Sequence, residues 1–461
     1  MHETEKYSHD FSLLDELRHS IETGTGDYIR TMPLCTYQAK NQPVSLDIRD
    51  ILLIGAITES DILLTGKTGS GKTKLACGVM KGLFGMDGYY AKTTLPTMNP
   101  SEFMDIDFPA ILEGRKTLRE AVSGISSLVK PGIVLNEVNR APAVIQSLLI
   151  AFLDRELEIQ GVPVEMGRKW HGGYYQLRIL TINEGDIYQV QNLDPAIRDR
   201  MTIEIPIDAF PQTKNDIYNM LKNNPFVHHE GRDFSGSRAI SQTELPDNFE
   251  KVVQLRMTIE NIPVHPRASL FLNYLSGLSH CIRAPRGNKE SIILSPEVCE
   301  GCHHMATFYN LCGNILAPSA RNLIRLQRMA KAFALFRSWR TGHMEDPIVL
   351  PEDIIEAAPF ILYSKLNLNP LWLRTAGDRT RPFLGDRWTA VREILSWLFK
   401  ERFSPLVAPK SGIGELVHMI YRGQPLILAD WEKIHNYILE KDPWACDPAM
   451  VRENLFPGRQ A

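Results

Sequence analysis

The sequence lacks any apolar run long enough to cross a membrane, and it lacks the apolar core of a signal peptide near its start. Its most apolar stretches, residues 51–57 and 148–153, are far shorter than the roughly 18 residues that a membrane helix needs. The chain opens on the polar segment MHETEKYSHD. These absences predict a soluble, cytoplasmic protein.

An excess of charge of one sign is also missing. The chain has 51 Lys and Arg residues against 54 Asp and Glu residues, a formal net charge of −3. Without a basic surplus there is no global field to attract nucleic acid or an anionic membrane. Cysteine is scarce: the 461 residues include seven, which is an odd number. That pattern indicates reduced thiols rather than a secreted disulfide framework.

The composition is that of a globular protein, with 44% hydrophobic and 23% charged residues. At about 150 residues per domain the length suggests roughly three domains. Changes in sequence pattern predict four regions. These are an N-terminal helical flank (1–48), an α/β nucleotide-binding core (49–210), a helical lid (211–368) and a Trp-rich helical region (369–461).

Short apolar runs separated by helical patterns fill the predicted core. This is how a parallel sheet with crossover helices appears in a sequence. The predicted strands are residues 61–65, 89–94, 132–136, 177–183 and 202–207. In the lid, helical periodicity is clearest over residues 323–334, after a possible N-cap at Ser319. The fold class expected is therefore α/β, with a five-stranded parallel sheet and a helical lid.

A phosphate loop follows the first predicted strand directly. Its glycines let backbone N–H groups wrap phosphates, and the helix that starts behind it directs further N–H groups at the same anion. Lys72 is expected to neutralise phosphate charge, and the Thr73 hydroxyl to bind Mg²⁺. The predicted ATP-binding residues are Gly66, Lys67, Thr68, Gly69, Ser70, Gly71, Lys72 and Thr73.

A second polar strand end lies 65 residues after Lys72, where the run GIVLN is followed by Glu137. Hydrolysis of a nucleoside triphosphate needs one polar group that orients the Mg²⁺ water shell and a carboxylate that aligns or deprotonates the attacking water. Asn136 and Glu137 are predicted to fill these two roles.

The segment LNEVNRAPAVIQSLLIAFLDRELEI resembles the Walker B strand, Asn-Arg-Ala-Pro turn and following helix of the MoxR-like AAA+ ATPases. The segments LTINEGDIYQVQNLDPAIRDRM and APSARNLIRLQRMAKAFAL resemble that family's sensor 1 and arginine-finger segment and its lid helix. The resemblance covers about residues 50–210 and 315–366. It implies an AAA+ core in a ring of subunits, with six as the expected number.

Residue by residue, the resemblance gives Asn183 the sensor 1 role and Arg200 the arginine-finger role in a neighbouring subunit's site. It gives Arg321 the sensor 2 role, for which Arg267 in VHPRASLF is the rival. One departure matters, because the family usually has Asp where this chain has Asn136. A neutral amide offers Mg²⁺ a dipole in place of a charge, so hydrolysis is expected to be slow.

A cysteine cluster within residues 281–312 predicts a structural Zn²⁺ site. Cys299 and Cys302 have C-x2-C spacing, and Cys312 follows ten positions on. The fourth ligand stays open among Cys281, His280, His303 and His304. The alternative is that Cys312 is a small buried hydrophobe and that the other two are a surface pair.

Together these patterns predict an ATPase that remodels, assembles or activates a partner complex. The resemblance implies that the partner bears a von Willebrand factor A domain or is another client protein. A nucleotide-dependent scaffold that barely hydrolyses ATP is the second hypothesis, with Asn136 as its distinguishing feature. A nucleic-acid motor is disfavoured by the near-neutral charge. The tryptophans of the last region are expected to be core residues.

Overall fold

The computed structural model describes most of the chain. The described residues are 11–26, 30–39, 42–104, 108–117, 120, 127–159, 161–171, 173–184, 193–223, 245–277, 319–342, 347–366, 368, 377–378, 381–382, 386–408, 410–422 and 424–441. The chain divides into two compact units, residues 1–259 and 260–461.

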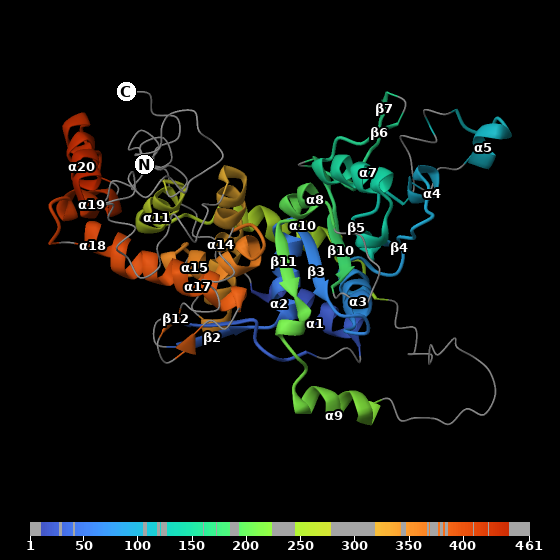
Figure 1. Cartoon of the computed structure of the whole chain (residues 1–461), viewed down its shortest axis with the longest axis horizontal. Helices are drawn as coiled ribbons and strands as arrows, with labels where there is room; N and C mark the ends of the chain where they lie inside the picture. Colours follow the sequence, from blue (N-terminus) through green and yellow to red (C-terminus); the bar gives the residue numbers. More distant parts are fainter. Residues whose placement is uncertain are drawn as a thin grey trace, which may run out of the picture. The chain divides into compact units, whose positions relative to one another are not determined.

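A sheet of five parallel strands forms the centre of the first unit (Figure 1), in the order β11-β3-β10-β5-β4. The strands are β3 (Asp61–Gly66), β4 (Tyr89–Thr93), β5 (Gly132–Asn136), β10 (Leu177–Asn183) and β11 (Ile203–Pro206). Each coincides with a predicted apolar run, which confirms the α/β fold class. All except β4 are buried along their whole length, as expected of strands covered on both faces.

The register of these strands brings their carboxyl ends to one edge of the sheet. Asn183 at the end of β10 pairs with Gly66 at the end of β3. Thr93 at the end of β4 pairs with Asn136 at the end of β5. Strand β10 lies between β3 and β5, so it separates the phosphate loop from the Asn136–Glu137 strand end. This edge is where open α/β sheets bind their ligands.

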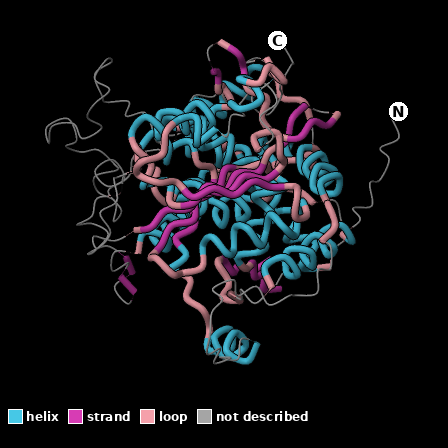
Figure 2. The backbone as a smooth tube through the Cα atoms, turned by 90° about the vertical axis from the view of Figure 1, so that its right-hand side faces the viewer, coloured by secondary structure: helices cyan, strands magenta, loops and turns pink. Residues whose placement is uncertain are grey.

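Helices lie on both sides of the sheet (Figure 2). Those of the first unit are α1 (Ser12–Thr25), α2 (Ile48–Ile57), α3 (Lys72–Phe84), α4 (Pro100–Met104), α5 (Phe108–Leu112), α7 (Ala143–Asp154), α8 (Pro195–Arg200), α9 (Lys214–Asn223) and α10 (Phe249–Glu260). Single-turn 3-10 helices are η1 (Val138–Arg140) and η2 (Ile207–Ala209).

The N-terminal flank is part of this first unit, and it is only partly helical. Helix α1 buries its predicted apolar face at Leu14, Leu17 and Ile21 and packs on α3. The rest of the flank was predicted without strands. Instead, β1 (Cys35–Ala39) and β2 (Gln42–Leu46) form an antiparallel hairpin, because apolar and polar residues alternate along both segments.

The boundary after the α/β core also lies later than the 210 expected from the sequence. Helix α10 is held in the first unit by polar contacts at its start and along its length. The Asn248 side-chain amide donates to the Gly82 carbonyl at 3.0 Å. The Arg256 guanidinium pairs with Glu59 at 3.0 Å. These contacts are long-range, so helical periodicity alone did not reveal them.

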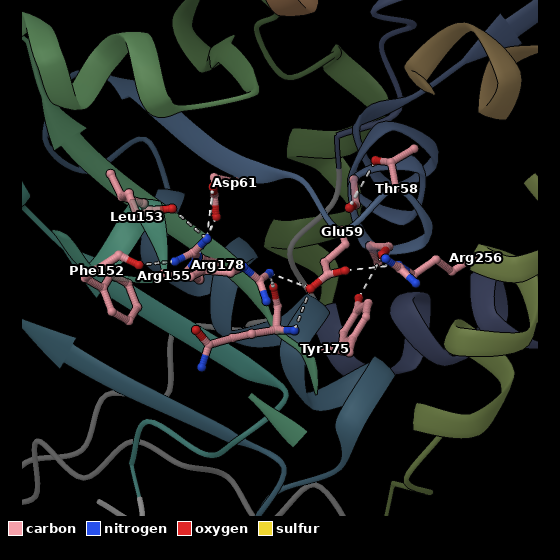
Figure 3. Close-up of polar contacts among 12 residues, drawn as sticks. Thr58, Glu59, Asp61, Phe152, Leu153, Arg155, Tyr175, Arg178 and Arg256 are labelled. Carbon is pink, nitrogen blue, oxygen red and sulfur yellow. Dashed lines mark hydrogen bonds and ion pairs between the residues drawn. The ribbon is translucent and has the colours of Figure 1, made fainter. Parts of the chain in front are cut away.

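A polar network braces the edge of the sheet opposite the strand carboxyl ends (Figure 3). Arg178 is 2% exposed, and its guanidinium donates hydrogen bonds to both carboxylate oxygens of Asp61, at 2.6 and 3.2 Å. The carboxylate of Glu59 pairs with Arg155, at the end of α7, and with Arg256 of α10. A buried arginine is tolerated only when its donors are paired. The network therefore links the starts of β3 and β10 to the end of α7 and to α10.

Two small hairpins separate α7 from β10. Their strands are β6 (Glu158–Ile159) with β7 (Val162–Pro163) and β8 (Arg168–Trp170) with β9 (Gly173–Tyr175). With Arg155 they line a cavity of about 520 Å³.

The second unit is mainly helical. Its elements are α11 (Pro266–Gly277), α14 (Ala320–Thr341), α15 (Pro351–Leu362), α17 (Arg387–Trp397), the π-helical turn η3 (Leu398–Phe403), α18 (Ser404–Leu406), α19 (Gly414–Tyr421), α20 (Leu428–Lys441) and the short pair β12 (Gly377–Asp378) and β13 (Arg381–Pro382). Among the described helices, none combines the length and apolarity needed to span a membrane.

Helix α14 is the helix predicted from residues 323–334. The Ser319 side chain caps it by accepting from the Asn322 amide at 3.4 Å. A buried ion pair between Arg337 and Asp353, at 2.9 and 3.0 Å, joins α14 to α15. In the last region Trp388 is buried, with its ring edge-on to Phe360 at 4.7 Å. Trp388 is thus a core residue, as expected.

Candidate nucleotide-binding and hydrolysis site

The predicted phosphate loop connects β3 to α3. Gly66, Gly69 and Gly71 all have positive φ angles, of 147°, 83° and 84°, which side chains on L-residues rarely allow. Gly71 is the N-cap of α3, and no side chain caps the helix. The first N–H groups of α3 therefore face the loop without side-chain partners, which is the arrangement that binds an anion at a helix start.

Lys72 is buried at the centre of this loop. Its ammonium donates to the carbonyls of Gly66 and Lys67, both at 2.7 Å, and to the Ser70 hydroxyl at 3.1 Å. These contacts satisfy all three donors of the ammonium. They also hold the charge at the mouth of the loop, where a phosphate oxygen could replace the carbonyls.

The electrostatics around Lys72 favour such an exchange. Burial lowers the pKa of the Lys72 ammonium, and the carboxylates of Asp208, Glu137 and Glu184 oppose that decrease. The nearby guanidinium of Arg30 lowers the pKa further. A bound phosphate would place negative charge beside the buried ammonium and so stabilise its charged form.

Two residues far away in sequence brace the loop from behind, and sequence reasoning missed both. The buried Arg30 guanidinium donates to the Ser70 carbonyl at 3.0 Å and to the carbonyls of Ile207 and Phe210. The Asp208 carboxylate accepts from the Lys67 amide at 2.7 Å. A Cβ on Gly66 would lie 3.1 Å from that same carboxylate. No local pattern marks either residue, because each acts through the folded chain.

The second strand end is held by its neighbours on both sides. The Glu137 amide donates to Thr181 Oγ1 at 3.1 Å, from β10. Thr94, after β4, donates from Oγ1 to the Glu137 carbonyl at 2.6 Å. Glu137 itself has φ 57°, an unusual value for a residue with a side chain. The backbone of Glu137 is therefore held in this conformation from both neighbouring strands.

The structure brings Glu137 and Asn183 together. Asn183 Nδ2 donates to Glu137 Oε1 at 2.9 Å. The Arg140 Nε lies 3.0 Å from Glu137 Oε2. Asn183 is buried, and Glu137 is partly exposed. A carboxylate that retains lone pairs and solvent access beside a phosphate loop can accept a proton from water.

The two residues predicted to bind Mg²⁺ differ in exposure. Thr73 is exposed at the start of α3, and Asn136 is buried at the end of β5, with Oδ1 3.4 Å from Thr181 Oγ1. Within the described ranges, no group of three or more His, Cys, Asp or Glu residues could hold a metal by itself.

We compared the chain with known proteins. It matches no protein-family model and no curated protein. Its fold matches those of 185 chains of solved structure. One is the crystal structure, at 2.00 Å resolution, of a "putative ATPase" from Cytophaga hutchinsonii. The match covers 84% of this chain and 96% of that one, with 17% sequence identity and a TM-score of 0.50.

The likeness is one of fold. A sheet that so many chains share does not by itself specify an activity, so function has to be argued from the site. The match supports the α/β core with its five-stranded parallel sheet.

Arg200 lies in the last turn of α8. Its Nε donates to Asp154 at 2.7 Å, and its Nη1 to the Ala196 carbonyl at 3.1 Å. Its neighbour Arg198 instead pairs with Glu184, the residue after Asn183, at 2.9 Å. Both arginines are therefore engaged within their own chain.

Arg321 lies in the second unit, exposed in the first turn of α14. Its rival Arg267 is built into that unit, since it donates to Ser404 Oγ at 2.7 Å and lies over the Phe399 ring. Arg321 thus has the more accessible position of the two. Cys299, Cys302 and Cys312, with the candidates for a fourth zinc ligand, lie outside the described residues.

Proposed function

We propose that the chain is an ATPase that binds ATP with Mg²⁺ and hydrolyses its terminal phosphate. One observation carries the proposal. A phosphate loop after β3, a carboxylate after β5 and an amide at the end of β10 meet at one edge of a parallel sheet, and Asn183 contacts Glu137 at 2.9 Å. This set supplies the positioning and the base that phosphoryl transfer to water needs.

In the proposed reaction the loop N–H groups and Lys72 hold the phosphates. The oxygen of a water molecule attacks the γ-phosphorus while Glu137 accepts a proton from that water. The bond between the γ-phosphorus and the bridging oxygen of the β-phosphate breaks. Thr73 and Asn136 would hold Mg²⁺, which neutralises charge on the phosphates. Asn183 has two amide hydrogens, so one is left for the water or the phosphate while the other bonds Glu137.

The motifs' resemblance to MoxR-like AAA+ ATPases supports a more specific proposal. Subunits would assemble in a ring, with six as the expected number. Arg200 would stabilise transition-state charge in a neighbour's site, and Arg321 would contact the nucleotide from the lid. Hydrolysis would remodel or activate a client, such as a complex with a von Willebrand factor A domain protein.

Asn136 favours a second candidate, an ATP-dependent scaffold or switch with weak hydrolysis. Where an acidic side chain would attract Mg²⁺ by charge, the Asn136 amide supplies only a dipole. Binding and assembly would then be the main outputs. The nucleic-acid motor stays the least favoured candidate, because the net charge is −3.

Binding and turnover measured in three variants test the ATPase. Lys72→Ala should abolish ATP binding, because the loop loses its buried ammonium. Glu137→Gln should bind ATP normally and stop turnover, since an amide cannot accept the proton. Lys74→Ala and Glu156→Gln are matched controls, since both side chains are exposed. Equal ATP affinity in Lys72→Ala, or full turnover in Glu137→Gln, would refute the assignment.

A further inference from the structure

The Asn139-Arg140 dipeptide is so far unassigned, and it contacts both members of the Glu137–Asn183 pair. Glu137 is the N-cap of η1, and the Arg140 amide donates to the Glu137 carbonyl at 2.8 Å. The turn brings the two side chains together, with Arg140 Nε 3.0 Å from Glu137 Oε2.

Asn139 points the other way, into the protein. It is 4% exposed, and its Nδ2 donates to the main-chain carbonyl of Asn183 at 2.8 Å. This bond ties the turn after β5 to the end of β10. The Asn183 side-chain amide in turn donates to Glu137 Oε1. By holding the Asn183 main chain, Asn139 therefore helps to position the donor of that hydrogen bond.

The Glu137 carboxylate is thus held at both oxygens, by Asn183 on one and Arg140 on the other. Its main chain is fixed as well, by Thr181 and Thr94. Each carboxylate oxygen has a second lone pair, so these contacts leave a place for water. The contacts restrict rotation of the carboxylate plane. A base has to lose this freedom in order to face one water molecule.

Resting on the proposed ATPase function, we propose that Asn139 and Arg140 are positioning residues for Glu137. Arg140 holds the second carboxylate oxygen, and Asn139 anchors the strand end that supplies the first contact. They touch neither phosphate nor water in this role. Their effect reaches the reaction through Glu137 and Asn183.

Two effects of Arg140 oppose each other, and their sizes decide the expected result. Its positive charge attracts the negative carboxylate, which favours the state before proton transfer. The two side chains are 37% and 26% exposed, and a solvated pair of that kind changes a rate by about fivefold at most. Misplacing a reacting group by 1 Å can cost about a hundredfold. Loss of Arg140 should therefore slow turnover.

The experiment compares Arg140→Gln, Arg140→Lys and Asn139→Ala with the wild-type chain, measuring kcat, KM and ATP affinity for each. Arg140→Gln should lower kcat by about tenfold or more while KM and ATP affinity stay within about twofold. Arg140→Lys should recover part of kcat, because it keeps the charge without the fork geometry. Asn139→Ala should also lower kcat selectively. Arg115→Gln, which breaks an exposed pair with Glu113, is the matched control and should change nothing.

The outcomes separate this inference from the proposed function. Unchanged or faster turnover in Arg140→Gln, beside an inactive Glu137→Gln variant, would overturn the inference alone. So would a parallel loss of kcat, ATP affinity and thermal stability, which indicates a merely structural role. A wild-type chain without turnover, or a fully active Glu137→Gln variant, would overturn the ATPase proposal and this inference with it.

Discussion

Arg200 is held by Asp154 through two of its nitrogens, Nε and Nη2, each 2.7 Å from the same carboxylate oxygen. Asp154 is the last residue of α7, the helix that begins just after the Glu137 turn. The two side chains are 21% and 28% exposed, so the pair is within reach of solvent. If Arg200 acts in a neighbouring subunit, it has to exchange Asp154 for that subunit's phosphate.

The first prediction separates an arginine finger from a structural ion pair. Arg200→Ala should lower turnover by about a thousandfold or more, the scale of finger loss in other nucleotide hydrolases. Asp154→Asn removes the same pair but leaves Arg200 in place, so turnover should stay within about fivefold. Similar losses in both variants would mean that Arg200 serves only to bind Asp154. Thermal melting of each variant is the control for folding.

A mixing experiment tests the same role between subunits. Arg200→Ala chains lack the finger, and Glu137→Gln chains lack the base, so each alone should be inactive. Mixed assemblies should recover part of the wild-type rate, because some interfaces combine an intact finger with an intact base. Light scattering with and without ATP checks that mixed rings form. Mixed rings with no recovered activity would leave Arg200 acting within its own subunit or not at all.

The second prediction concerns zinc. Purified protein should carry about one zinc per chain, held by Cys299, Cys302, Cys312 and one of the four open candidates. Cys299→Ser with Cys302→Ser should remove the metal and lower the melting temperature, as chelation should in the parent. ATP binding at Lys72 should survive at least in part. Elemental analysis that finds no metal in protein purified without chelator would dismiss the site.

The third prediction tests how α1 supports the helix behind the phosphate loop. A Cβ on Gly82 would lie 2.4 Å from the Ser20 carbonyl oxygen and 2.8 Å from Ile21 Cα. A steric overlap with backbone atoms at such distances can be relieved only if α1 moves. Gly82→Ala should therefore lower the free energy of unfolding by about 1–3 kcal/mol in denaturant melts. Lys74→Ala on the same helix is the control, and an equally stable Gly82→Ala variant would contradict the close packing.

The features that sequence reasoning found are local ones. The phosphate loop is eight consecutive residues, and the five strands are short apolar runs, so composition and spacing identify them. Asn136 and Glu137 could be proposed because they lie at the end of a predicted strand, and Asn183 because its segment resembles a family motif. That Asn183 contacts Glu137 also depends on β10 lying beside β5, a fact of strand order that periodicity does not contain.

The residues that sequence reasoning missed act across long stretches of chain. Arg30 reaches Ser70 over 40 positions and Phe210 over 180, and Asp208 reaches Lys67 over 141. Arg140 is close in sequence to Glu137, yet its contact depends on the 3-10 turn and on the positive φ of Glu137. Such contacts follow from the folded geometry, so no spacing rule marks them beforehand.

The last prediction concerns Asn136, which is 4% exposed and whose Oδ1 lies 3.4 Å from Thr181 Oγ1. Asn136→Asp keeps the size and this contact while adding a charge that attracts Mg²⁺. If the neutral amide limits metal handling, the variant should raise kcat and reach half-maximal rate at lower Mg²⁺. A buried carboxylate without a cation is costly, so the variant should melt at a lower temperature than the parent in the absence of Mg²⁺ and recover when MgATP is added. Asn99→Asp, which adds the same charge at an exposed position, is the control and should change neither rate nor metal dependence. An unchanged or lower kcat in Asn136→Asp would show that the amide is not what limits turnover.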